Sequence, residues 1–223
     1  DWGGVVRFSL PDQDVFAIDA NANPPVQDGS FAHVGTILFN MAVNPVSGLL
    51  YVTNTEAQNQ VRFEGTRPLA GHGSAFSTVL GRQHQTQITV IDPVAGSVQA
   101  RHLNKHINYA VSPAPPGLQA NSLALPRGVV VSGDGSQIYL AAAGSGKVAV
   151  LQASQVENDS FTPSVSDHIV ISGGGPSGLA LDEARGQLYV LTRFDNGISV
   201  VDLATHTETR HYRLPNPEPP AVV

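Results

Sequence analysis

The stretch Pro176–Asp202, PSGLALDEARGQLYVLTRFDNGISVVD, decides the fold of this chain. Its alternating apolar run Leu179–Leu181 predicts a first strand, and a polar turn leads from there to a second strand centred on Tyr189. The turn Asp195–Gly197 (Asp-Asn-Gly) adopts positive φ at low cost, so it favours a tight hairpin into a third strand at Ile198–Asp202. The stretch therefore predicts a run of short antiparallel strands.

The same order of strands and turns occurs in two earlier segments, residues 39–56 (FNMAVNPVSGLLYVTNTE) and 126–151 (PRGVVVSGDGSQIYLAAAGSGKVAVL). Because one such unit cannot bury both faces of its sheet, repeated units stack side by side around an axis. The repeat thus predicts an all-β fold, a β-propeller of four-stranded antiparallel blades, with no helical segment between the units. The tyrosines of the second strands are Tyr51, Tyr139 and Tyr189, and the third strands are Ile88–Asp92, Lys147–Leu151 and Ile198–Asp202.

A fourth, outer strand completes each predicted unit. The N-terminal residues fit a unit without its first strand, with second, third and fourth strands at Val5–Leu10, Asp14–Ala20 and Phe31–Ile37. The chain then holds about three and a half blades of roughly 40–45 residues, whereas closed propellers have about four to eight. We therefore expect part of a larger ring of about seven blades, completed by a downstream domain or another protein chain. The other outer strands are predicted at Val98–Leu103, His168–Ile171 and Thr207–Leu214.

Two segments interrupt the repeat, residues 57–86 inside one blade and residues 104–124 between two blades. Long connections of this kind usually carry function. The tail, residues 215–223, is rich in proline and predicts an extended linker that leaves the domain. The expected division is 1–37 (incomplete first blade), 38–103 (blade with the insertion), 104–124 (inter-blade loop), 125–171 (blade), 172–214 (blade) and 215–223 (exit linker).

Composition narrows the class of partner. The chain has 223 residues and a formal net charge of −6, and its two lysines and scattered arginines argue against nucleic acid as a partner. No apolar run is long enough to span a bilayer as a helix. The lack of cysteine excludes disulfides, thiolate metal sites and covalent c-type haem within the chain itself. The first residue is Asp1, so we expect a processed product or a fragment.

The runs LYVTN (50–54) and LYVLTRFDNGISVVD (188–202) are similar to the repeat of YVTN-type β-propellers. Three further runs resemble bacterial exported proteins in which such a propeller precedes a c-type cytochrome domain related to dihaem peroxidases. They are RHLNKHINYAV (101–111), GGGPSGLALDEARGQLYVLTRFDN (173–196) and NPEP (216–219). The resemblance implies a periplasmic or extracellular location. It also implies that any haem lies in a downstream domain, outside this chain.

His102 and His106 form an H-x3-H pair, a spacing that on a helix places both rings on one face for metal binding. Here the pair crosses from a predicted strand end into a loop, and four extended residues span about 13 Å. A shared metal then requires that the loop turns back, and we favour the alternative, hydrogen-bonded loop anchors. A second set, His72 and His84 with Glu64, contains ligand types that suit Zn, Cu or Fe. Apart from such a metal ion, we expect no cofactor in the chain.

Arg193 and Asp195 lie at a predicted hairpin tip, and Asn54 and Glu56 hold the corresponding place in an earlier blade. Equivalent tips gather at one end of a propeller, where polar side chains can hold a small ligand. Arg127 belongs to the same set of candidate ligand-binding residues. The alternative, which we favour, is pairing between blades, with Arg193 bonded to a neighbouring loop.

Three aspartates recur at the end of the third strand, Asp19, Asp92 and Asp202. A carboxylate at this repeated position can accept backbone N–H bonds in the turn that follows. We therefore predict a structural role for all three.

Ser177 lacks the G-x-S-x-G context of a hydrolase nucleophile, and no catalytic set is evident. We therefore expect a non-catalytic propeller scaffold or binding domain of a larger exported bacterial protein. Two alternatives stay open. The chain could cover a cytochrome or peroxidase-like redox domain, or it could be a self-assembling surface protein whose open blade edges pair with other chains.

Overall fold

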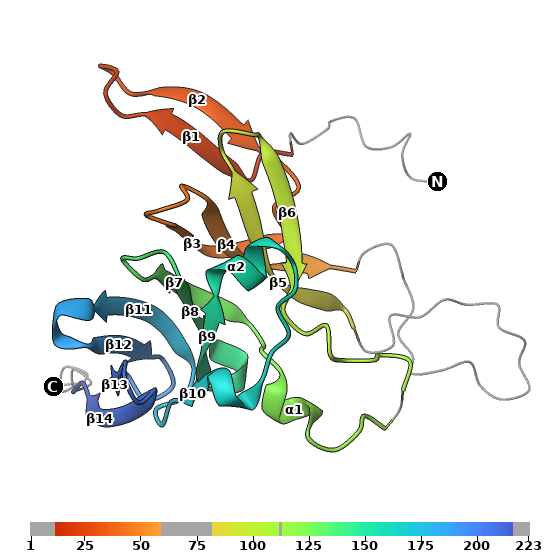
Figure 1. Ribbon diagram of the computed structural model, residues 1–223, viewed down its shortest axis with the longest axis vertical. Helices are drawn as coiled ribbons and strands as arrows, with labels where there is room; N and C mark the ends of the chain where they lie inside the picture. The colour runs from red at the N-terminus through yellow and green to blue at the C-terminus, as the bar shows by residue number, and fades with distance from the viewer. Residues whose placement is uncertain (1–11, 59–81, 112, 216–223) are drawn as a thin grey trace, which may run out of the picture.

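The computed structural model describes residues 12–58, 82–111 and 113–215. These residues form one two-stranded and three four-stranded antiparallel sheets (Figure 1). The two-stranded sheet contains β1 (Val15–Asp19) and β2 (Val26–Phe31). The first four-stranded sheet contains β3 (Ile37–Val43), β4 (Leu50–Ala57), β5 (His84–Asp92) and β6 (Ser97–His102). The second contains β7 (Pro126–Val131), β8 (Gln137–Ala142), β9 (Lys147–Gln152) and β10 (His168–Val170). The third contains β11 (Pro176–Asp182), β12 (Gln187–Thr192), β13 (Gly197–Asp202) and β14 (Thr207–Arg213).

In every sheet the neighbouring strands follow one another along the chain, so each sheet is an antiparallel meander. The first strands of the four-stranded sheets, β3, β7 and β11, lie side by side. The sheets form an arc, with β1 and β2 at one end and the sheet of β11 to β14 at the other (Figure 1). This is the blade arrangement of a partial β-propeller, and the predicted fold class is confirmed.

Each blade packs against the next through a repeated set of side chains. Tyr51 of β4 lies in one core cluster with Ile138 and Leu140 of β8. Tyr139 of β8 lies in a second cluster with Leu188 and Val190 of β12. Because side chains alternate along a strand, each blade has a tyrosine face, which carries this tyrosine, and an opposite aliphatic face. The tyrosine face of one blade covers the aliphatic face of the following blade.

The predicted turn carboxylates are confirmed. Asp92 Oδ1 accepts hydrogen bonds from the backbone N–H groups two and three residues ahead, both at 2.9 Å. Asp202 Oδ1 accepts the same two bonds, from the N–H groups of Ala204 and Thr205 at 3.1 and 2.8 Å. Asp19 Oδ1 accepts a bond from the N–H group two residues ahead, at 2.9 Å. The bonds from Thr205, backbone first, hold the pKa of Asp202 below its usual value. The three aspartates therefore have the structural role that their repeated position predicts.

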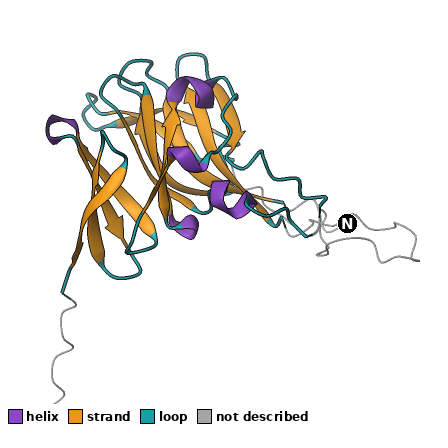
Figure 2. Ribbon diagram, turned by 60° about the horizontal axis from the view of Figure 1, so that its bottom comes forward, coloured by secondary structure: helices purple, strands orange, loops and turns teal. Residues whose placement is uncertain are grey.

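Short helices correct the prediction that no helical segment separates the strands. α1 (Leu118–Asn121) lies between β6 and β7, and α2 (Ala153–Glu157) follows β9 (Figure 1). Figure 2 shows the short helices in purple beside the orange strands. Ala153 and Val156, three residues apart, are both buried in the first core cluster, so one helical turn satisfies this burial better than an extended segment. No helix in the described ranges is long and apolar enough to cross a bilayer. Single 3₁₀ turns occur at η1 (Ala143–Ser145), η2 (Val165–Asp167) and η3 (Glu183–Arg185).

The outer strand of the incomplete blade was predicted at Phe31–Ile37, which is wrong. β2 already ends at Phe31, and Ile37 begins β3. The polar sequence of β2 gives no apolar alternation, and only its pairing with β1 defines it. The segment between the two strands is held instead by Val34, which is buried and donates its N–H to Asp14 Oδ2 at 2.8 Å. The predicted strand Val5–Leu10 lies outside the described residues.

Candidate functional site

A chain of hydrogen bonds joins β12, β13 and β14 in the last blade. His211 Nδ1 lies 2.8 Å from Ser199 Oγ, and His211 Nε2 lies 2.6 Å from Asp195 Oδ2. Thr192 Oγ1 donates to Asp195 Oδ1 at 2.7 Å. We call Thr192, Asp195, Ser199 and His211 the last-blade relay. The relay ties the β12–β13 turn to the outer strand of the blade.

The relay has the groups of a hydrolytic triad, a hydroxyl, an imidazole and a carboxylate. However, Ser199 is fully buried on the aliphatic face of its blade, where a substrate carbonyl cannot reach its Oγ. The ring of His211 is also closely covered, because a Cβ atom at Gly173 or Gly197 would collide with it. The arrangement therefore stabilises the blade and does not present a nucleophile.

Asp195 is engaged through both of its carboxylate oxygens. The hydrogen bond from Thr192, then the bond and charge of His211 and the charge of Arg213, hold its pKa below the usual value. Arg213 Nε lies 3.4 Å from Asp195 Oδ2. Arg193, at the same predicted hairpin tip, is exposed, and its backbone N–H donates to Gly175 O at 3.2 Å. Asp195 is therefore held by side chains of its own blade, whereas Arg193 contacts the loop before β11 through its backbone.

The sequence analysis named Asp195 but missed the other members of the relay. A usable signal was present, because Thr192 and Ser199 are polar at strand positions that face a neighbouring blade. The same two positions in β4 and β5 hold Asn54 and Thr89, and Asn54 Nδ2 donates to Thr89 Oγ1 at 2.8 Å. Comparing the units position by position would therefore have found both polar pairs.

Asn54, a predicted ligand-binding residue, lies inside its blade. Its side chain is fully buried, and its Nδ2 also donates to Val52 O at 3.0 Å. Its Oδ1 has no hydrogen-bond partner among the described residues. Only glycine fits at Gly35, because a Cβ there would collide with the Asn54 carboxamide. The close contact leaves no room for a ligand between these two residues.

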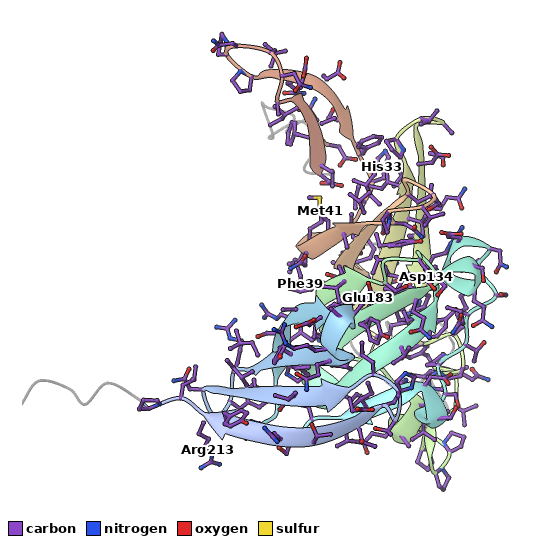
Figure 3. All side chains as sticks on the ribbon, turned by 60° about the vertical axis from the view of Figure 1, so that its left-hand side comes forward. His33, Phe39, Met41, Asp134, Glu183 and Arg213 are labelled. Atoms are coloured by element: carbon purple, nitrogen blue, oxygen red, sulfur yellow. The ribbon has the colours of Figure 1, made fainter. Side chains whose placement is uncertain are left out.

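Glu56, by contrast, lines a surface hollow of about 500 Å³ next to the incomplete blade. Its Oε2 accepts a hydrogen bond from Thr36 Oγ1 at 2.9 Å. Asp12 Oδ2, in the same hollow, lies 2.6 Å from Nδ1 of His33, which Figure 3 labels. With Asp14 as a third carboxylate, the lining is acidic and suits a cationic group of a partner.

Arg127 lies at a β-bulge of β7, and the first strand of each four-stranded blade has a bulge at the equivalent place. Bulges redirect side chains. The Arg127 guanidinium stacks over the ring of Phe39, at the bulge of β3, with 4.9 Å to the ring centroid. Its carbonyl accepts a hydrogen bond from Thr53 Oγ1 at 2.6 Å. Arg127 thus joins two blades.

His102 ends β6 beside several cationic groups. Its ring lies 6.4 Å from that of Tyr109, and the Arg82 guanidinium stacks over Tyr109 at 4.7 Å. Burial, followed by the charges of Arg82 and Lys105, lowers the pKa of His102 to about 4. The ring is therefore neutral at neutral pH, and its buried Nε2 has no partner among the described residues.

His106 anchors the connection between β6 and β7. Its Nε2 lies 3.3 Å from both Leu118 O and Ser122 Oγ, as the loop-anchor alternative predicts. His84 is exposed at the first position of β5, outside the connection in which it was predicted. Among the described residues, no group of three or more His, Asp or Glu side chains is placed to hold a metal ion. His72 and Glu64 lie outside the described residues.

The fold is similar to solved β-propeller structures. Hydrazine synthase of Kuenenia stuttgartiensis is 18 % identical over 80 % of this chain and 49 % of that chain, with a TM-score of 0.55. The periplasmic gluconolactonase PpgL of Pseudomonas aeruginosa is 14 % identical over 91 % of this chain and 49 % of that chain, with a TM-score of 0.56. This chain therefore spans about half the length of each. No protein-family model matches the sequence, and no curated protein does.

Proposed function

We propose that this chain is a non-catalytic β-propeller scaffold or binding domain of a larger exported bacterial protein. The burial of Ser199 is the observation that supports the proposal. The serine, histidine and aspartate that could form a hydrolytic triad instead form hydrogen bonds that join the strands of the last blade. Asn54 and Thr89 form a comparable internal bond in the first four-stranded blade. These hydrogen bonds inside the blades give rigidity, which a scaffold requires.

The two long connections, residues 57–86 and 104–124, would present the binding surface. Both ends of the second connection are fixed by Asn104, whose Oδ1 accepts from Leu123 N–H at 2.8 Å and whose Nδ2 donates to Leu123 O at 2.6 Å. Lys105 forms an ion pair with Asp159, which adds a contact to the next blade. Anchors of this kind reduce the conformational entropy that a connection loses when it binds a partner.

A fluorophosphonate probe, which labels accessible nucleophilic serines, tests the non-catalytic role. We expect no label on Ser199 in the folded protein, and no hydrolysis of esters or lactones that Ser199→Ala removes. Circular dichroism of Ser199→Ala provides the control for folding. Labelled Ser199, or hydrolysis lost in a folded Ser199→Ala protein, would contradict the proposal.

Export and completion of the ring are further parts of this proposal, and a cap on a downstream redox domain is its alternative. The runs at 101–111, 173–196 and 216–219 support export and a downstream c-type cytochrome domain. Sequencing the gene beyond Val223 tests the second point, since a Cys-x-x-Cys-His motif is expected there. An open reading frame without this motif would contradict the hypothesis of a downstream cytochrome domain. Recovery of the protein from the cytoplasmic fraction of its host would contradict export.

A further inference from the structure

The last blade leaves its tyrosine face uncovered. The residue two positions after the tyrosine is Thr53 in β4, Ala141 in β8 and Leu191 in β12. Thr53 and Ala141 are 0 % exposed beneath the following blade, whereas Leu191 is 43 % exposed. On the same face, Tyr212 pairs with Ile198 across β14 and β13 and is 50 % exposed. Within the part of the chain that the structure describes, the last blade therefore forms only one side of the interface that the earlier blades repeat.

The incomplete blade leaves the opposite kind of surface uncovered. Phe16 and Ile18 of β1 are 49 % and 61 % exposed. β1 ends at Asp19 and β13 ends at Asp202, and both aspartates hold the same place in the repeat. Counted back from these aspartates, Phe16 and Ile18 correspond to Ser199 and Val201 of β13. Those two residues are 0 % exposed because the preceding blade covers them. Among residues 12–58, 82–111 and 113–215, no preceding blade covers the aliphatic face of the incomplete blade.

We propose that the tyrosine face of the last blade binds the aliphatic face of the incomplete blade in a second copy of this chain. The proposal rests on the scaffold function and names its partner. The proposed contact would repeat the interfaces already present in the chain, because both interfaces between four-stranded blades join a tyrosine face to an aliphatic face. The chain exposes one of each, at opposite ends of the arc (Figure 1).

Two copies close one ring through two identical interfaces. Closure makes the second contact intramolecular, so a dimer forms in preference to an open polymer.

Sedimentation velocity over roughly 1 to 100 µM protein tests the proposal. We expect a species of twice the 23.4 kDa chain mass. Leu191→Glu and Ile18→Glu each place a charge in the interface and weaken the dimer by about tenfold or more. Val94→Glu is the matched control, because Val94 is 96 % exposed in the β5–β6 turn and lies on neither face. The control variant keeps the dimer.

A charge-swap experiment identifies the two faces as partners. Leu191→Lys and Ile18→Glu chains dimerise poorly when separate and form a heterodimer when mixed, because one interface is then wild type and the other pairs opposite charges. A monomer at every concentration, a polymer that grows with concentration, or a dimer that neither face variant weakens would overturn the proposal. None of these results bears on labelling of Ser199, which tests the scaffold function separately.

Discussion

His211 Nε2 lies 2.6 Å from Asp195 Oδ2, and this contact joins the outer strand of the last blade to its β12–β13 turn. The blade before it has no polar pair at the related positions, where Ala142 and Ala149 are fully buried. The first four-stranded blade has Asn54 and Thr89 at these positions, joined by a hydrogen bond. The polar groups therefore lie on the buried aliphatic face in the first and last four-stranded blades, where hydrogen bonds within the blade satisfy them.

Loss of the Ser199 hydroxyl should weaken the last blade. Ser199→Ala removes one buried hydrogen bond to His211 and lowers the free energy of unfolding by about 1 kcal/mol. Urea denaturation followed by circular dichroism measures the change. Ser166→Ala, an exposed serine of η2, is the control and leaves the midpoint unchanged. An equal loss in both variants would contradict a specific role for the relay.

Most of the blade architecture could be predicted from sequence, because Tyr51, Tyr139 and Tyr189 mark half-buried strands between turn residues. The outer strand β2 could not, since a strand exposed on both sides needs no apolar alternation. The contact of His211 with Asp195 was also missed, because a lone histidine in a polar outer strand has no local signal. The bulge that brings Arg127 onto Phe39 depends on pairing between strands, which one sequence does not reveal.

Acidification should destabilise the protein through His102. The unfolded chain binds a proton there below about pH 6.5, whereas the folded protein binds it near pH 4, since the pKa of His102 is lowered to about 4. The unfolded state therefore binds more protons in this window, and stability falls as the pH drops through it and then levels off. His168, whose pKa is also lowered by burial, acts in the same direction.

Urea midpoints at several pH values between about 7 and 4 measure this dependence. His102→Gln keeps a polar side chain without the titration and should flatten the curve. Aspartates such as Asp202, whose pKa is lowered, contribute a further loss of stability only as the pH falls below their ordinary pKa. An unchanged curve in His102→Gln would show that His102 does not contribute.

The Tyr51 hydroxyl bridges two blades, so its removal should cost stability. It donates to Glu157 Oε1 at 2.6 Å and accepts from Asn44 Nδ2 at 3.0 Å, and burial is the main cause that raises the pKa of Tyr51 to about 12. Tyr51→Phe lowers the free energy of unfolding by about 1 to 2 kcal/mol. Tyr189→Phe, whose hydroxyl bonds Gln187 within one blade, is the matched control and has a smaller effect. A larger loss in the control would contradict the bridging role.

Asn104 should control the order of the connection that follows β6. Asn104→Ala removes both hydrogen bonds to Leu123, so amide hydrogen exchange across residues 104–124 becomes faster while the sheets keep their protection. Asn108→Ala, at an exposed position of the same connection, is the control. Exchange that accelerates equally in both variants would show that Asn104 is not the anchor.

Comparing Ala141 with Leu191 tests the directional stacking of the blades most directly. The two residues hold equivalent positions, but a following blade covers Ala141, whereas no blade of the described residues covers Leu191. Thermal unfolding of Ala141→Glu and Leu191→Glu, followed by circular dichroism at low protein concentration, makes the comparison. We predict that Ala141→Glu abolishes cooperative unfolding, because it buries a charge, whereas Leu191→Glu keeps a cooperative transition near that of the wild-type monomer. Equal tolerance of glutamate at both positions, or loss of folding in Leu191→Glu alone, would contradict the account.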